Sequence, residues 1–175
     1  MKLSPSMERY ILHWGEMGSR WGVNKSVAQV HALLYLSGDP LNADEIVETL
    51  GIARSNVSTS LKELQSWDLI ELSHVMGDRR DYFEAKTDLW EMLLTIIEGR
   101  KRREIDPTLS VMRKLVIEAR EDPDLPKTAR KRMEKMLDFM ESTSGWYDQM
   151  SRLPKPVLTK LMKMGSKVSK FVKKG

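Results

Sequence analysis

The chain has no cysteine among its 175 residues. This absence excludes disulfides, thiolate metal ligands and cysteine nucleophiles. Histidine is also scarce, and the wide spacing of His13, His31 and His74 argues against a histidine metal cluster or a catalytic triad. There is no phosphate-binding glycine loop, nucleophile elbow or motif-placed pair of carboxylates. We therefore expect no metal site, no cofactor and no enzymatic activity.

Long apolar runs are absent as well. The uncharged apolar stretches are far shorter than the ~18 residues that a membrane-spanning helix needs. Residues 1–6 contain no apolar signal core. The content of 41% hydrophobic and 31% charged residues is ordinary for a soluble globular protein. We expect a cytoplasmic protein.

The net charge of +4 is unevenly distributed along the chain. Residues 155–175 carry seven lysines and no acidic residue, whereas residues 1–154 carry 22 basic and 25 acidic residues. The basic total therefore describes the C-terminal segment and not the body of the protein. By itself it is a poor argument for nucleic-acid binding.

Helical periodicity dominates the remaining sequence. Apolar residues recur every three or four positions between Met7 and Trp21, which predicts a first helix with Ser4 as its cap. A second helix is expected after Asn24, ending at residues 38–40. Further helices are expected from residues 87–88, with a break at residues 106–107, and after a loop at residues 122–126.

The most informative segment runs from Leu41 to Lys86. Asn42 and Glu45 form a capping-box pattern at the start of a short helix, and Gly51 is a natural stop. A second helix is expected over residues 54–67. Two alternating runs, residues 69–75 and 81–85, then flank a turn at residues 77–80. This order predicts a winged helix-turn-helix, in a mainly α fold with a small β-hairpin.

The helix over residues 54–67 is the predicted recognition helix. On a helical wheel its apolar residues and Ser60 share one side. The opposite side carries Ser55, Ser58, Thr59 and Lys62, with Asn56 at its margin and Arg54 at its start. These side chains can reach base edges and phosphates in a DNA major groove. The alternative is a merely solvated helix face, but so many Ser and Thr residues are poor helix formers that a simple surface helix would not need.

The turn between the two strands carries Asp78-Arg79-Arg80-Asp81. We expect one arginine to enter a DNA minor groove and an aspartate to hold it in place. The spacing does not decide which arginine does so. The alternative is a self-neutralising surface turn.

The predicted first helix is rich in glycine and tryptophan. Gly15, Gly18 and Gly22 suggest a backbone that another helix or a small molecule approaches closely, because each helical glycine costs ~1 kcal/mol relative to alanine. Trp14 and Trp21 share the adjacent face and, with Tyr35, are candidates for binding a cationic effector. The alternative is that this face packs in a dimer core.

The segment from Leu41 to Lys86, LNADEIVETLGIARSNVSTSLKELQSWDLIELSHVMGDRRDYFEAK, resembles the DNA-binding region of MarR-type winged-helix transcriptional regulators. The preceding HWGEMGSRWGVNKSVAQVHALLYLS resembles the branch named after GbsR, the glycine betaine synthesis regulator. The resemblance implies a homodimer that binds pseudo-palindromic double-stranded DNA, usually as a repressor. The family's wing pattern of Asp, any residue, Arg matches Asp78 and Arg80. Some members of this branch are linked to choline and glycine betaine, which suggests an osmolyte effector.

Four segments are expected. Residues 1–38 form N-terminal helices for dimerisation and a pocket, 39–87 the winged helix-turn-helix, 88–152 C-terminal dimerisation helices, and 153–175 a basic amphipathic tail. In this tail the apolar stripe is expected at Val157, Leu161, Met164, Val168 and Phe171.

Three roles fit the tail: an arm on the partner subunit, a phosphate-binding extension, or a helix on an anionic membrane, with membrane contact the least favoured. The competing function for the whole chain is a non-catalytic protein–protein or membrane-surface adaptor that acts through this tail.

Overall fold

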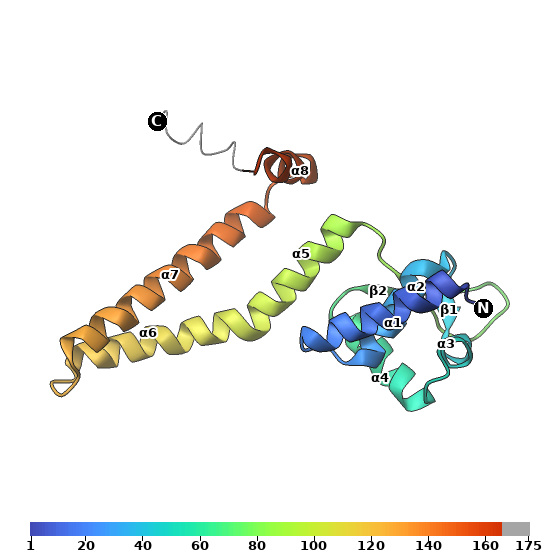
Figure 1. Ribbon diagram of the computed structural model, residues 1–175, viewed down its shortest axis with the longest axis horizontal. Helices are drawn as coiled ribbons and strands as arrows, with labels where there is room; N and C mark the ends of the chain where they lie inside the picture. The colour runs from blue at the N-terminus through green and yellow to red at the C-terminus, as the bar shows by residue number, and fades with distance from the viewer. Residues whose placement is uncertain (166–175) are drawn as a thin grey trace. The chain divides into compact units, whose positions relative to one another are not determined.

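The computed structural model describes residues 1–165, which fall into two compact units. The first unit spans Met1–Ile96 and the second begins at Ile97. Both are mainly helical, and the small sheet lies in the first (Figure 1). This composition confirms the expected mainly α fold. Within residues 1–165 no helix is long and apolar enough to cross a bilayer.

The first unit has the element order of a winged helix-turn-helix, preceded by two helices. In chain order its elements are α1 (Pro5–Arg20), α2 (Lys25–Ser37), β1 (Leu41–Asn42), α3 (Ala43–Leu50), α4 (Arg54–Ser66), β2 (Ile70–Ser73) and β3 (Tyr82–Ala85), and α5 (Leu89–Arg100) begins in this unit. Helices α3 and α4 form the helix-turn-helix, and β2, β3 and the loop between them form the wing.

Local sequence signals set the ends of α3, and so fix the turn that leads into α4. The Oδ1 atom of Asn42 accepts the backbone N–H groups of Asp44 (3.0 Å) and Glu45 (3.1 Å). In return the Asn42 N–H donates to Oε2 of Glu45 at 2.8 Å, which completes the predicted capping box. Gly51 ends the helix in the left-handed region at φ 62°.

The core of the first unit lies where α2, α3 and α4 meet the sheet. Helix α2 packs against both α1 and α4. The fully buried side chains include Val30 and Leu33 of α2, Ile46 of α3 and Val57 of α4. Leu61, Leu64, Ile70 and Phe83 complete the contact between α4 and the sheet. Because full burial of one such side chain stabilises by about 1.5–3 kcal/mol, this cluster fixes the orientation of α4.

The sheet has three antiparallel strands in the order β1-β3-β2. Leu41 of β1 pairs with Phe83 of β3, a contact that the sequence did not indicate because two residues carry no periodicity. The predicted hairpin strands are too long: β2 ends at Ser73 and β3 begins at Tyr82. The intervening residues form the wing tip.

Lys86 ties the base of the wing to the start of α5. Its Nζ atom lies 2.8 Å from the carboxylate of Asp68 and 3.4 Å from that of Glu91. The Lys86 side chain is only 14% exposed. The hydrogen bond to Asp68 raises the pKa of Lys86, so the lysine stays charged.

Two of the three glycines near the first helix are explained by its packing on α2. A Cβ atom on Gly18 would lie 2.6 Å from the Cβ of Ala28, and one on Gly15 would lie 2.7 Å from Cγ of Gln29. The prediction that Gly22 also belongs to the first helix is wrong. Gly22 lies beyond the end of α1, has φ +76° and forms part of the turn into α2. The close approach is therefore made by a helix of the same chain.

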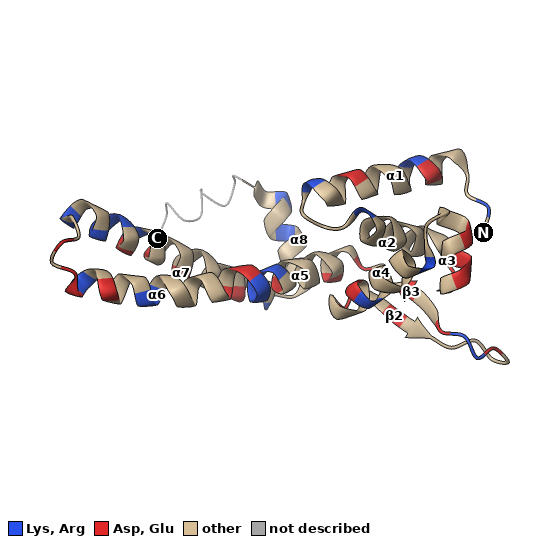
Figure 2. Ribbon diagram, turned by 90° about the horizontal axis from the view of Figure 1, so that it is seen from below, with Lys and Arg blue, Asp and Glu red and all other residues tan. Residues whose placement is uncertain are grey.

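The second unit contains an antiparallel helix pair. It comprises the end of α5, the π-helical turn η1 (Lys101–Ile105), α6 (Asp106–Glu121), α7 (Lys127–Ser151) and α8 (Lys155–Met164). Two ion pairs join α6 to α7: Arg113–Glu141 (2.7 Å) and Arg120–Glu134 (3.2 Å). The earlier residue of α6 pairs with the later residue of α7, as antiparallel helices require. Both helices carry acidic as well as basic residues, as Figure 2 shows.

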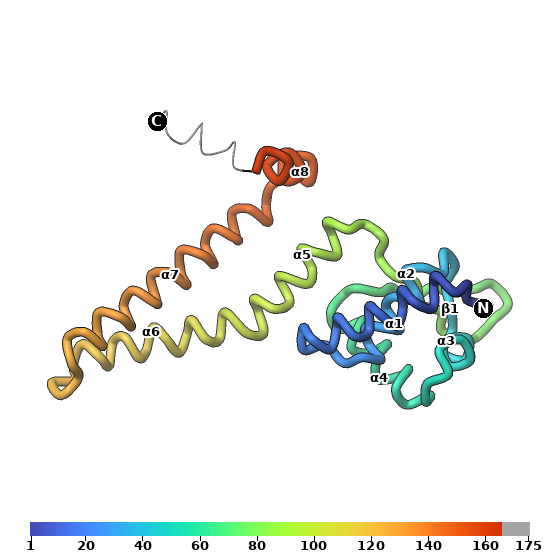
Figure 3. The backbone as a smooth tube through the Cα atoms, in the orientation of Figure 1, coloured from blue at the N-terminus to red at the C-terminus, as the bar shows by residue number. Residues whose placement is uncertain are grey.

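The predicted break at Asp106-Pro107 is wrong. The backbone stays helical at Arg100, Ile105 and Asp106. Figure 3 shows the helical turns continuing without interruption from η1 into α6. Proline lacks an N–H and its ring clashes with the carbonyl four residues earlier in a regular α-helix. A π turn widens the helix just before Pro107, and such turns are a known way to accommodate a local irregularity.

The amphipathic tail is described only as far as residue 165. Helix α8 begins at Lys155, within the predicted tail, and has Pro156 in its first turn. Its buried residue is Leu158, whereas Val157 of the predicted stripe is 41% exposed. Val168 and Phe171 lie outside the described residues.

Replacing Gly18 by alanine is expected to destabilise the first unit by about 1–2 kcal/mol, because the fixed Cβ of Ala28 cannot move away without shifting α2. Gly15→Ala is the matched control in the same helix. Its new methyl would meet the flexible Gln29 side chain, so we expect a smaller loss. Urea unfolding of both variants measures the difference, and equal losses would contradict this packing account.

His31 makes the stability of the first unit depend on pH. It is 6% exposed, its Nε2 atom has no partner among the described residues, and burial lowers its pKa from 6.5 to about 4. The unfolded chain therefore binds the proton more readily, and stability falls as pH drops from about 6.5 toward 4.

Between pH 7 and pH 5 this linkage amounts to about 2 kcal/mol. His31→Leu removes the titration, so its unfolding free energy should fall by about 2 kcal/mol less than that of the native chain over the same interval. Urea titrations at both pH values test this expectation. Parallel pH profiles for the two proteins would show that His31 is not responsible.

Candidate nucleic-acid interface

Helix α4 divides into the two faces that the wheel predicts. Val57, Ser60, Leu61 and Leu64 are buried. The predicted contact residues are all exposed: Arg54, Ser55, Asn56, Ser58, Thr59 and Lys62. Packing of the first set on α2 and α3 therefore leaves the second set on the surface.

The N-terminal end of α4 has free hydrogen-bonding capacity. Its cap residue is Ala53, which provides no side-chain hydrogen bond. The first N–H groups of a helix have no intrahelical partner, and together with the helix dipole they favour an anion. Short serine and asparagine side chains in this turn leave room for a close approach.

The wing tip holds one arginine firmly. The guanidinium of Arg80 donates to both carboxylate oxygens of Asp78, with Nε–O distances of 3.0 and 2.9 Å and an Nη2–Oδ2 distance of 2.5 Å. The Arg80 backbone N–H also donates to Asp78 at 3.0 Å. The hydroxyl of Tyr82 donates to Asp78 at 2.8 Å and accepts from Arg80 at 3.0 Å. The three side chains form a closed network.

This network keeps both charges in place. The hydrogen bonds from Arg80 hold the pKa of Asp78 well below its usual range, and the bond to Asp78 raises the pKa of Arg80. The Arg80 side chain nevertheless remains 54% exposed, so it can still contact a partner. Arg79 is exposed, and within the described residues it has no ion pair.

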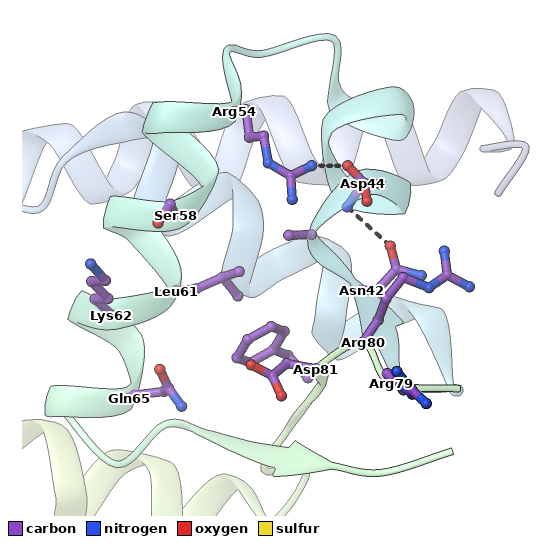
Figure 4. Close-up of a pocket in the computed structure, with 12 residues that line it drawn as sticks. Asn42, Asp44, Arg54, Ser58, Leu61, Lys62, Gln65, Arg79, Arg80 and Asp81 are labelled. Carbon is purple, nitrogen blue, oxygen red and sulfur yellow. Dashed lines mark hydrogen bonds and ion pairs between the residues drawn. The ribbon is translucent and has the colours of Figure 1, made fainter. Parts of the chain in front are cut away.

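The recognition helix and the wing line one groove of about 470 Å³ (Figure 4). Helix α4 contributes Arg54, Ser58, Lys62 and Gln65, and the wing contributes Arg79, Arg80 and Asp81. Asn42, Ala43 and Asp44, around the start of α3, also contribute. Four cations and two carboxylates therefore face the same groove, which favours a polyanion over a neutral or cationic ligand.

The sequence-predicted site residues do not all meet there. Ser55, Asn56 and Thr59 are exposed on α4 but do not line the groove. Sequence reasoning missed Gln65, although it follows Lys62 by three residues and Ser58 by seven on the same helical face. It also missed Asp44, which forms an ion pair with Arg54 across the turn between α3 and α4. Only the tertiary structure shows that pair.

The aromatic effector candidates are placed differently from one another. Trp14 packs against the core and stacks on Tyr10 with ring centroids 5.4 Å apart. Tyr35 is half-buried. The pKa of Tyr10 is raised, first because Tyr10 is partly buried and second because of electrostatic repulsion from the Tyr35 phenolate. Trp21 is 65% exposed at the C-terminal cap of α1. Trp14 and Tyr35 thus lie near Tyr10, whereas Trp21 is not enclosed with them.

Comparison with known proteins agrees with this architecture. The chain is 22% identical over 142 residues to the HTH-type transcriptional repressor GbsR of Bacillus subtilis (strain 168), covering 79% of this chain and 78% of that protein. It is 18% identical over 136 residues to the HTH-type transcriptional repressor OpcR of the same organism, covering 76% and 74%.

The crystal structure of a transcriptional regulator superposes with a TM-score of 0.57 at 17% identity, covering 84% of this chain and 96% of the other. This similarity concerns the fold. The sequence profile of the MarR family matches residues 15–81, from within α1 to the wing tip. Residues 15–81 of this chain are therefore similar in sequence to the MarR family, and they lie in the winged helix-turn-helix unit.

Proposed function

We propose that this chain is a sequence-specific DNA-binding transcriptional regulator that acts as a repressor. One observation carries the proposal: a single cationic groove is lined by Arg80, which Asp78 holds, and by four exposed residues of α4, namely Arg54, Ser58, Lys62 and Gln65. The names of the similar repressors support the same function.

The contacts follow from the groove's two sides. Helix α4 enters a major groove, where Ser58 and Lys62 reach base edges and phosphates. The side chain of Arg80 enters the adjacent minor groove, whose negative potential attracts a guanidinium. Arg79 contacts the phosphate backbone, and Arg54 reaches a phosphate or a guanine. The other exposed polar residues of the recognition helix, Ser55, Asn56 and Thr59, complete the major-groove contact.

A homodimer is part of the proposal. Large apolar side chains are exposed on the second unit's helices, including Ile117 (58%), Phe139 (67%) and Trp146 (63%). So much exposed apolar surface is typical of an interface. We assign dimerisation to residues 88–152 together with the N-terminal helices of residues 1–38.

A quaternary ammonium effector of the choline or glycine betaine class is the finer part of the proposal. The Tyr10–Trp14 stack near Tyr35 supports a site for such a cation, since aromatic faces attract quaternary ammonium groups. Effector binding would change DNA affinity only by favouring one arrangement of the two wings over another.

Selection from a random duplex pool at about physiological salt is expected to enrich an inverted repeat. Each recognition helix reads one half-site, and the half-sites lie about one helical turn or a multiple apart. Binding should weaken steeply with salt, because phosphate contacts release counterions. Enrichment of no sequence, with or without choline or glycine betaine, would contradict the proposal. Liposome binding that depends on residues 155–175 would instead support the adaptor function.

Arg80→Ala is expected to weaken binding to the selected duplex by about tenfold or more, because it removes the minor-groove contact. The side chain is half exposed, so the melting temperature should not change. Arg132→Ala is the matched control, since it removes an exposed arginine that does not line the groove. Gel-shift titrations compare the variants, and unchanged affinity in Arg80→Ala would refute this assignment.

A further inference from the structure

The first turn of α3 places a carboxylate inside the cationic groove. Asp44 is the second residue of α3 and lines the groove together with Arg54, the first residue of α4. Their side chains form an ion pair across the helix-turn-helix (Figure 4). Asp44 is 58% exposed and Arg54 64%, so both remain accessible to a partner.

An exposed carboxylate in this position opposes a polyanionic ligand. It repels phosphate, and an exposed ion pair contributes little to folding stability. Helix capping does not require Asp44 either, because Glu45 completes the capping box and places an acidic side chain in the same first turn. Its presence therefore calls for a role beyond stability.

The wing shows what that role is. Asp78 also lies beside an arginine of the groove and fixes its guanidinium. The carboxylate of Glu45 attracts the same Arg80, so the first turn of α3 interacts with arginines from both sides of the groove. The Asp44–Arg54 pair is thus a second aspartate–arginine pair: Asp78 holds an arginine of the wing, and Asp44 holds an arginine of the recognition helix.

We infer that Asp44 is a positioning residue for sequence-specific DNA recognition, which holds Arg54 in the orientation that contacts DNA. The inference rests on the proposed function. A long arginine side chain loses conformational freedom when it binds, and a partner that orders it beforehand removes part of that cost. Asp44 thus raises affinity for the correctly fitting duplex while its charge lowers affinity for DNA in general.

Because of these two opposing effects, loss of the Asp44 charge should change the affinities for specific and non-specific DNA in opposite directions. Asp44→Asn removes the negative charge and weakens the hold on Arg54. We expect affinity for a scrambled duplex to rise and affinity for the selected duplex to fall, so that their ratio drops by roughly three- to tenfold. Asp44→Glu, which keeps the carboxylate, should recover part of the ratio. Fluorescence anisotropy with both duplexes at several salt concentrations measures it.

Two further variants separate positioning from simple charge. Glu48→Gln removes an exposed carboxylate from the same helix but outside the groove, and should raise affinity for both duplexes alike. In an Arg54→Ala background, Asp44→Asn should leave the ratio unchanged, because the residue to be positioned is absent.

The outcomes are distinct. If Asp44→Asn raises both affinities equally, as Glu48→Gln does, Asp44 is only a surface charge and the inference fails. If it lowers both equally along with the melting temperature, its role is structural and the inference also fails. A full-length native protein that prefers no duplex overturns the proposed function, and the inference with it.

Discussion

The burial of one side of α4 is the constraint on which the rest of the interface depends. Val57, Leu61 and Leu64 pack against α2, α3 and the sheet and are almost fully excluded from solvent. With each such side chain stabilising by about 1.5–3 kcal/mol, rotating the helix would cost more than any surface contact could return. The polar face is therefore held outward, and the same core contact through Phe83 anchors the strand that carries the wing.

The groove combines attraction with order. Its four cations exceed its two carboxylates, so it attracts phosphate, yet two of the arginines are individually paired with an aspartate. Pairing lowers the net charge but reduces the number of side-chain orientations. An interface of unpaired lysines would bind any duplex, whereas ordered guanidinium groups can favour one groove shape. Arg80 is the more firmly ordered of the two paired arginines, because it is hydrogen-bonded to both Asp78 and Tyr82.

Local signals in the sequence predicted local structure well. Ser4 and Asn42 cap their helices as expected, the helix expected after Asn24 is present with Asn24 as its cap, and Gly51 ends α3. The errors arose where the outcome depends on distant residues. Strand β1 exists only because Phe83 pairs with Leu41, and Pro107 does not interrupt the helix because a π turn absorbs it. Gly22 belongs to a turn, although its spacing from Gly18 is helical.

The sequence by itself determined the winged helix-turn-helix, the exposed face of α4 and the basic wing tip, because helix periodicity, caps and turn residues act over only a few positions. It left open which wing arginine is held, and it did not indicate the contact between Asp44 and Arg54. Those features were decided by the tertiary structure, since a hydrogen bond or an ion pair depends on where two backbones meet. Arg79 and Arg80 are neighbours in the chain, but only Arg80 lies within reach of both Asp78 and Tyr82.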